Sequence, residues 1–217
     1  MKEFIKRIEG CNLCEAAQYK DLVNAKSKPY LEFKVYEEWV PEEVKCLFIG
    51  ESPPGRGVFF YDHRVEGTLR RNIFSLLEID KSNYEGLCEF RRRGLLLTDA
   101  LKCRVKKKGK IPKGVIENCL GIFKHEIELL AKSRNVRKLV VLGRTALEAL
   151  KMLGFGELEG LSVARDCGRV VKSQGFEVFL CALPLPRNKK YWNTPQVRGS
   201  LKSFLEHGNS TQTKIKI

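Results

Sequence analysis

Four of the eight cysteines in the chain, Cys11, Cys14, Cys103 and Cys119, have a spacing that suits metal ligation. The first two form a C-x-x-C pair, and the other two bracket the lysine-rich segment RVKKKGKIPKGVIEN after a long gap. Structural zinc sites usually combine two short cysteine pairs, whereas a [4Fe–4S] cluster accepts dispersed thiolates. The spacing therefore favours a cluster over zinc, and coincidentally buried cysteines are the third interpretation.

The other cysteines and the N-terminus indicate a reducing compartment. The segment MKEFIKRIEG has no apolar signal region, and no apolar run approaches the ~18 residues of a membrane span. We expect an intracellular protein, in the cytoplasm or nucleoid, without a disulfide framework. Cys46 and Cys181 adjoin apolar runs and are interpreted as core thiols, whereas Cys88 and Cys167 lack spaced partners and receive no function.

The charge of the chain indicates a polyanionic partner. There are 40 Lys and Arg against 26 Asp and Glu, which gives a formal charge of +14. Nucleic acid is the favoured partner, and a surface adapted for solubility is the alternative. Two basic segments are candidate phosphate-contacting surfaces, and their residues are Lys106, Lys107 and Lys108 in one and Arg187, Asn188, Lys189, Lys190 and Tyr191 in the other.

Four short apolar runs predict the sheet that would position these groups. They cover residues 44–50, 94–103, 138–143 and 176–186, and residues 115–132 between the second and third runs have helical spacing. This alternation predicts a three-layer α/β/α sandwich with a central, mostly parallel, four-stranded sheet. We expect one domain over residues 1–207 and a flexible tail over 208–217. The loops GESPPGRG, TDALKCR and LPLPRNKKYW would lie at the carboxyl ends of the strands, where sites form in such sheets.

Three segments, TDALKCR, ENCLGIFKHEIELL and KLVVLGRTALEALKML, resemble the iron–sulfur branch, often called family four, of the uracil-DNA glycosylase superfamily. The resemblance extends from Cys11 to about Trp192. It implies the α/β/α fold and a structural [4Fe–4S] cluster held by the four spaced cysteines, which would fix the loop with the lysines. It also implies a monofunctional DNA glycosylase of base-excision repair, acting as a monomer on DNA with a damaged base, without an obligate protein partner.

The loop GESPPGRG resembles the first motif of that superfamily and contains the candidate catalytic groups. Glu51 would stabilise the positive charge that develops on the sugar and orient the attacking water, and Ser52 stands where other branches place a water-positioning Asp or Asn. The alternative is an exposed Glu at a helix start with no role. In the following FFY run, Phe60 is the candidate for stacking on the flipped base, against the alternative that all three rings belong to the core.

Two departures from the resemblance concern the base itself. Asp99 replaces an Asn that would bind uracil, and an ionised carboxylate offers only acceptors, so it would repel uracil O4 and suit the N–H edge of a purine. Asp99 is thus a candidate either for reading the base or for catalysis. We expect the excised base to be a deaminated or modified base, with a purine as the alternative to uracil. Leu183 replaces a His that would stabilise the leaving base, and it is assigned to the base pocket.

Two other functions fit the same residues. A non-catalytic iron–sulfur protein on the same fold could bind nucleic acid after losing the Asn and the His. A redox-sensing regulator is the third interpretation, and it requires that the affinity for DNA change with the oxidation state of the cluster.

Overall fold

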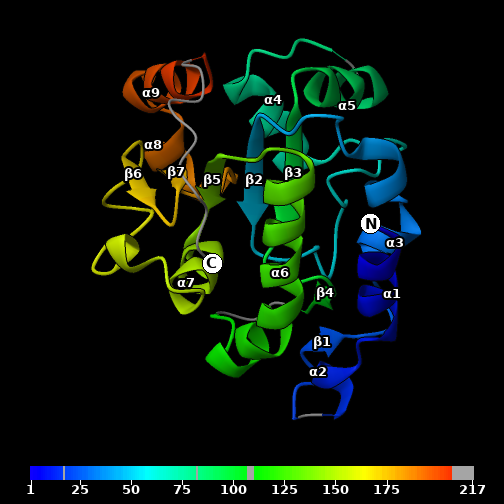
Figure 1. The fold of residues 1–217 in the computed structure, drawn as a ribbon. Helices are drawn as coiled ribbons and strands as arrows, with labels where there is room; N and C mark the ends of the chain where they lie inside the picture. The colour runs from blue at the N-terminus through cyan, green and yellow to red at the C-terminus, as the bar shows by residue number, and fades with distance from the viewer. Residues whose placement is uncertain (17, 82, 107–109, 207–217) are drawn as a thin grey trace.

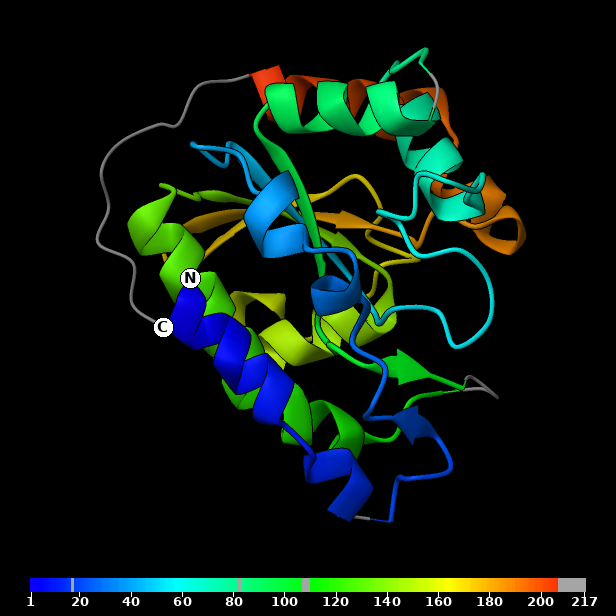
Figure 2. The same ribbon diagram turned by 90° about the vertical axis from the view of Figure 1, so that its right-hand side faces the viewer.

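A five-stranded sheet between two layers of helices forms the molecule (Figure 1). The structure is a computed structural model that describes residues 1–16, 18–81, 83–106 and 110–206. Figure 2 shows α4, α5 and α9 on one face of the sheet and α1, α6 and α7 on the other. The three-layer α/β/α class predicted from the sequence is therefore confirmed.

The strands follow the predicted apolar runs. In spatial order the sheet is β3-β2-β5-β7-β6, and the first four strands are parallel. Nearly every residue of β2, β3, β5 and β7 is buried, which explains the continuous apolar runs, because both faces of the sheet are covered by helices. The strands are β2 (Cys46–Gly50), β3 (Leu95–Asp99), β5 (Lys138–Leu142), β6 (Val170–Ser173) and β7 (Phe176–Cys181).

The prediction of four strands is wrong by one. Strand β6 pairs antiparallel with β7 at the edge of the sheet, with Ser173 opposite Phe176. Its sequence VVKS is short and mixed, and three of its four side chains are at least partly exposed. An edge strand of this kind has no continuous apolar run, so the criterion that found the buried parallel strands missed it.

Helix α6 (Lys113–Ser133) contains the predicted helical segment and lies across one face of the sheet (Figure 1). Within the described part of the chain, no helix is long and apolar enough to cross a bilayer. The other helices that cover the sheet are α1 (Lys2–Gly10), α4 (Thr68–Leu76), α5 (Asn83–Arg92), α7 (Arg144–Met152) and α9 (Pro195–Glu206). Short helices complete the chain: α2 (Leu13–Ala16), α3 (Pro29–Glu32), the π-helix η1 (Val35–Trp39), the 3-10 helices η2 (Gly156–Leu158) and η3 (Pro186–Asn188), and α8 (Lys189–Trp192).

A second, two-stranded sheet ties the N-terminal segment to the main domain. Strand β1 (Val23–Asn24) pairs antiparallel with β4 (Arg104–Val105), which directly follows Cys103. Figure 1 places this small sheet beside α2, below the ends of β2 and β3. The two segments that contain the spaced cysteines are therefore paired through backbone hydrogen bonds.

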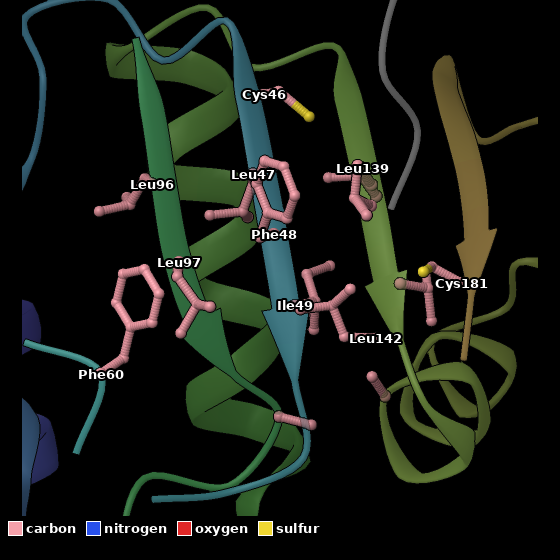
Figure 3. Packing of buried hydrophobic residues seen from close by; sticks show 14 of the residues in the cluster. Cys46, Leu47, Phe48, Ile49, Phe60, Leu96, Leu97, Leu139, Leu142 and Cys181 are labelled. Carbon is pink, nitrogen blue, oxygen red and sulfur yellow. The ribbon is translucent and has the colours of Figure 1, made fainter. Parts of the chain in front are cut away.

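The core consists of the apolar side chains of the strands and the inner faces of the helices (Figure 3). Cys46 and Cys181 have no exposed surface, which confirms their prediction as core thiols. Their position inside the sheet explains why they sit within apolar sequence.

Candidate active site

Polar groups gather where the parallel strands end. Asp99 is the last residue of β3, and it is paired in register with Gly50, the last residue of β2. Glu51 follows Gly50, Thr145 lies in the first turn of the helix after β5, and Leu183 follows β7 by two residues. The order of the strands places all of these residues along one edge of the sheet.

Asp99 is buried, with 5% of its surface exposed, and its Oδ2 accepts a hydrogen bond of 2.9 Å from the Tyr30 hydroxyl. Burial raises the pKa of Asp99 to about 7, since water no longer stabilises the carboxylate. Lys102 and the Tyr30 hydroxyl act in the opposite direction, whereas the negative charges of Glu51 and Glu126 raise the pKa further. Near neutral pH this carboxyl group therefore exists in both protonation states.

The close pairing of Asp99 with Gly50 depends on the absence of a side chain at Gly50. A Cβ atom placed there would lie 2.2 Å from Asp99 Oδ1. Any other residue would therefore push the carboxylate out of its position at the strand end. This glycine of the GESPPGRG loop has a steric role beside Asp99.

Glu51 is partly exposed, and its Oε2 accepts a short hydrogen bond from the Thr145 hydroxyl. Its main-chain oxygen accepts from the N–H of Leu101 at 3.1 Å, which ties the loop after β2 to the loop after β3. Ser52, the next residue, is also partly exposed. The structure thus brings Glu51 and Asp99 together, as the sequence predicted, and adds Thr145 as a group that orients the Glu51 carboxylate.

The rest of the GESPPGRG loop rests on β4. Arg104 Nη1 donates to the main-chain oxygen of Pro54 at 2.8 Å, and the N–H of Val105 donates to the oxygen of Pro53. A Cβ atom on Gly55 would lie 2.2 Å from the Val105 oxygen, so only glycine allows this approach. The loop that contains Glu51 is therefore held by the strand that begins one residue after Cys103.

Below Asp99 lies a fully buried ion pair. Lys102 Nζ and Glu126 Oε2 are 2.5 Å apart, and each residue is 1% exposed. Lys102 Nζ also donates to Thr98 Oγ1 and to the main-chain oxygen of Asp99, and Glu126 accepts from the Tyr36 hydroxyl at 2.8 Å. We call Tyr30, Tyr36, Thr98, Asp99, Lys102 and Glu126 the strand-end network. It fixes the main chain of Asp99 from below, as the Tyr30 hydroxyl fixes its side chain.

The aromatic residues after the first motif point in two directions. Phe60 packs between Phe74 and Phe90, at centroid distances of 6.2 and 5.4 Å, and is 3% exposed. Phe59 instead contacts Tyr30 at 5.1 Å, on the side of Asp99. In this conformation Phe60 belongs to the core under α4 and α5, so its role as a stacking ring stays a prediction. Phe59 is the ring of this pair that lies next to the strand-end network.

The segment after β7 folds back on itself. Leu183 is partly buried, and its main-chain oxygen accepts from Asn188 Nδ2 at 3.0 Å. Trp192 is 4% exposed, and its indole N–H donates to the Leu185 oxygen, so it anchors the loop and does not project from it. Asn72 of α4 donates to the Pro184 oxygen at 2.9 Å. Leu183 thus lies at the carboxyl ends of the strands, as predicted, in a loop that these hydrogen bonds hold in place.

The basic residues predicted to contact DNA are at the surface where they are described. Arg187, Lys189 and Lys190 are exposed, and the Lys190 ammonium lies 5.0 Å from the centre of the partly exposed Tyr191 ring. Lys106 is exposed at the end of β4. Lys107 and Lys108 lie outside the described residues.

The four spaced cysteines line one pocket. Cys11, Cys14, Cys103 and Cys119 surround it together with apolar side chains and Lys102. Burial raises the pKa of Cys103 to about 11 and that of Cys119 to about 12, and the neighbouring cysteines contribute to both shifts. Among the described residues, no three His, Cys, Asp or Glu side chains are grouped as a ready site for a metal ion.

Sequence reasoning missed Thr145 and every member of the strand-end network except Asp99, namely Tyr30, Tyr36, Thr98, Lys102 and Glu126. Thr145 lies in the LGRTA segment, which was used for the resemblance but not for the chemistry. Lys102 and Glu126 look like ordinary surface charges in the sequence, because nothing local shows that they are buried against each other. Tyr30 lies in a segment without a clear pattern, and only the tertiary structure brings it to Asp99.

The comparison with protein families gives one match. A model described as the uracil DNA glycosylase superfamily matches residues 37–204, which is most of the chain. The matched region includes Cys103 and Cys119 and begins after the C-x-x-C pair. A search of curated proteins found no match.

Proposed function

Because the chain belongs to the uracil-DNA glycosylase superfamily, we propose that it is a monofunctional DNA glycosylase of base-excision repair. Its reaction is hydrolysis of the N-glycosidic bond of a damaged base that has been flipped out of the duplex. The observation that carries the proposal is the pair of carboxyl groups, Glu51 and Asp99, held next to each other where β2 and β3 end. They differ in burial, which suits two different roles.

Glu51 is assigned to the sugar. Cleavage of the glycosidic bond leaves positive charge on the sugar ring, and a fixed carboxylate near that ring lowers the barrier. The Thr145 hydroxyl donates to one carboxylate oxygen of Glu51 and so fixes the orientation of this carboxylate at the strand end. Ser52, which is partly exposed beside it, is assigned to the positioning of that water.

Asp99 is assigned to the base, and its protonation state determines which base fits. The ionised carboxylate has acceptors only and suits the adjacent N–H donors of a guanine-like edge. The protonated group has one donor and one acceptor, the pattern of an asparagine amide, and suits uracil O4 and N3–H. With a pKa of about 7, Asp99 supplies both patterns near neutral pH. The charged and titratable groups around it are Tyr30, Lys102, Glu51 and Glu126.

The residue at position 183 affects the leaving base. Leu183 offers no hydrogen bond to a departing anion. Glu51 and Asp99 must then supply more of the lowering of the activation barrier, or the base must be one that leaves readily, such as a base alkylated at a ring nitrogen. Because this wall of the pocket offers no hydrogen bond, it favours damaged bases whose glycosidic bond already breaks easily.

A [4Fe–4S] cluster is proposed for the pocket of the four spaced cysteines. Cys11, Cys14, Cys103 and Cys119 would hold it, and the lining of one pocket by all four supports this assignment. The cluster would supply a structural cross-link between the N-terminal helices and the loop after β3. Asn118 Nδ2, 3.7 Å from Cys14 Sγ, would donate to a ligating thiolate.

Phosphate contacts are assigned to the exposed basic residues. Arg187, Lys189 and Lys190 follow the loop of Leu183, and Lys106 follows the proposed cluster. Each phosphate contact releases counterions, so we expect duplex affinity to fall steeply with salt.

The proposal is tested by an excision panel. Duplexes that differ only in one base, uracil, hypoxanthine, xanthine or an alkylated purine, are incubated with the protein at pH 6 and pH 8.5 and then cleaved with alkali. We expect release of at least one base, with uracil favoured at the lower pH. Glu51→Gln should lower the rate by roughly 10²–10³-fold, whereas Glu148→Gln, a partly exposed carboxylate of α7, should not change it.

Two outcomes would contradict the proposal. Duplex binding without excision of any base would favour the non-catalytic alternative. Equal rates for the wild type and Glu51→Gln would remove Glu51 from the reaction. For the role of Asp99, the Asp99→Asn variant should excise uracil with little dependence on pH over this range, because the amide cannot ionise.

A further inference from the structure

Two cysteines outside the cluster pocket lie next to each other at the end of β7. The thiol of Cys181, the last residue of β7, donates to the main-chain oxygen of Ala182 at 3.3 Å. The N–H of the same residue, Ala182, donates to Cys167 Sγ at 3.4 Å, so both sulfurs lie against Ala182. Two backbone hydrogen bonds, from Gly168 N–H to Leu180 and from Leu180 N–H to Arg169, extend the β6–β7 pairing and hold Cys167 at this position.

The two thiols have different environments. Cys167 is partly exposed, whereas Cys181 is fully buried. The neighbouring Cys181 thiol and the hydrogen bond from the Ala182 N–H lower the pKa of Cys167, whereas the neighbouring Cys167 and burial raise the pKa of Cys181. A partly exposed sulfur that accepts from a backbone N–H, beside a second and buried thiol, has the arrangement of a reactive cysteine with a resolving cysteine.

We propose that Cys167 and Cys181 form a redox-active pair that closes to an intrachain disulfide when the protein meets a peroxide. The Cys167 thiolate attacks one peroxide oxygen, so the O–O bond breaks, an alcohol or water leaves, and Cys167 becomes a sulfenic acid. Cys181 then attacks the Cys167 sulfur, the S–O bond breaks, and the Cys181 proton leaves with the oxygen as water. Overall, two thiols are oxidised to one disulfide and one peroxide is reduced.

The position of the pair connects it to the loop that follows β7. Cys181 and Cys167 hold the strand end from which the chain continues to Leu183 two residues later. Closure would covalently join the segment before β6 to the strand end that carries this loop. The pair itself requires neither the cluster nor the glycosylase reaction, so its test is independent of the proposed function.

The test is peptide mapping of the full chain. The purified protein is treated with an equimolar amount of hydrogen peroxide, free thiols are blocked with N-ethylmaleimide at acidic pH, and trypsin is added. Cleavage after Arg165, Arg169, Lys172 and Arg187 releases the peptides 166–169 and 173–187, each with one cysteine. We expect these two peptides to appear as one linked species, lighter than their sum by two hydrogen atoms, that dithiothreitol separates.

Three variants make the result specific. Cys167→Ser should abolish the linked species, and Cys88→Ser, which removes an exposed cysteine, should leave it unchanged. Cys181→Ser should instead accumulate a sulfenic acid at Cys167, which a 1,3-diketone reagent such as dimedone labels in peptide 166–169.

Several results would overturn the proposal. One is the absence of the linked species in the wild type under conditions that oxidise Cys88. Another is a persistent sulfinic acid at Cys167 with Cys181 still reduced, and a third is a disulfide from Cys167 to any other cysteine. The wild-type map decides these cases alone, even if a serine variant fails to fold.

Discussion

Two charged networks in the molecule use similar groups in opposite environments. In the strand-end network, Glu126 pairs with Lys102, and both are 1% exposed. On α5, Glu89 accepts from Arg92 at 2.8 Å and from Arg93 at 2.7 Å, and these two arginines are 74% and 38% exposed. Glu89 itself is 7% exposed, so each network places one buried carboxylate against cationic groups at hydrogen-bond distance. The difference between them is that the cations on α5 reach water.

Burial of the Lys102–Glu126 ion pair does not by itself stabilise the fold. Removing two charges from water costs several kcal/mol for each ion, and the attraction between them offsets this only when the remaining donors and acceptors are also satisfied. Tyr36 and Thr98 supply those contacts to Glu126. An apolar pair of similar volume would fill the same space, but it would not hold the main-chain oxygen of Asp99, which accepts from Lys102 Nζ at 2.6 Å.

The network on α5 follows local sequence. Glu89, Arg92 and Arg93 are three and four residues apart near the end of one helix, where such side chains are neighbours. Long side chains in water gain little from such pairing, since solvent and salt screen the charges. The comparison shows that the distances of an ion pair say little about its importance when its burial is not considered.

Neutralising one side of the buried pair should have the largest effect on stability. Glu126→Gln leaves the Lys102 ammonium buried without a counter-charge, and we expect a loss of about 3–5 kcal/mol in the free energy of unfolding. Urea denaturation measures this loss. The control is Glu128→Gln on the same helix, where the carboxylate is 43% exposed and should have little influence.

A second variant separates charge from volume at the same site. If an unpaired charge is the cause, the double substitution Lys102→Met with Glu126→Leu should recover most of the stability that Glu126→Gln loses. A double variant that is no more stable than the single one would mean that the hydrogen bonds, and not the charges, hold this region together.

The pH dependence of Asp99 should produce the next largest effect. Its pKa is raised from 3.8 to about 7 by folding, so the folded state holds the proton more tightly than the unfolded state. The wild type therefore loses stability relative to Asp99→Asn as the pH rises from about 4 to about 7, by at most ~4 kcal/mol, and the difference is constant above that range.

The measurement is urea unfolding of the wild type and Asp99→Asn at pH 4.5 and pH 8.5. Asp62 is the control, because its hydrogen bond with Arg64 lowers its pKa. The stability that Asp62 contributes is present above its unfolded pKa of 3.8 and is lost only as the pH falls below that value. The difference between the wild type and Asp62→Asn should therefore stay nearly constant between pH 4.5 and pH 8.5. A constant difference between the wild type and Asp99→Asn over this range would mean that Asp99 titrates normally.

The contrast between the networks also explains what the sequence could predict. Buried parallel strands leave continuous apolar runs, so β2, β3, β5 and β7 were found, and the edge strand β6, without such a run, was not. The sequence also placed Glu51, Asp99 and Leu183 at the carboxyl ends of the strands, where the structure has them, because the ends of parallel strands lie on the same side of a sheet.

The partners of those residues could not be predicted in the same way. Glu126 is 27 positions from Asp99 in the chain, and Tyr30 is 69 positions from it. In the sequence, Glu126 falls in the helical pattern of α6 beside exposed acids of the same type. Burial of a charge is a property of the packed fold, and a local pattern does not report it. The choice between Phe59 and Phe60 has no local signal either, since adjacent rings in a loop have no fixed period, and the role of Phe60 stays a prediction.

A smaller effect is expected when the hydroxyl that contacts Asp99 is removed. Tyr30→Phe deletes the 2.9 Å hydrogen bond to Asp99 Oδ2, which we expect to cost about 1–3 kcal/mol at a pH where the carboxylate is ionised. Because this bond lowers the pKa of Asp99, its loss should raise that pKa. The pH at which base preference changes in the excision panel should then move upward.

Tyr36→Phe provides the matched control for Tyr30→Phe. It removes a hydroxyl of the same network, but one that contacts Glu126 and not Asp99. We expect a comparable loss of stability and a smaller change in the pH profile of base preference. If both variants shift the profile equally, the hydroxyl of Tyr30 has no specific influence on Asp99.

The smallest effect is expected in the network on α5. Arg92→Ala removes one cation from Glu89, but Arg93 still donates to the same carboxylate and Lys81 lies 3.9 Å from it. The hydrogen bond from Arg92 is the main reason that the pKa of Glu89 is lowered to about 2, so its contribution is present above the normal value of 4.5 and is lost as the pH falls toward 2. At neutral pH we expect Arg92→Ala to lower the urea midpoint slightly, and less in high salt than in low salt, because solvent and salt screen this exposed arginine. A loss similar to that of Glu126→Gln would show that exposure does not separate the two networks.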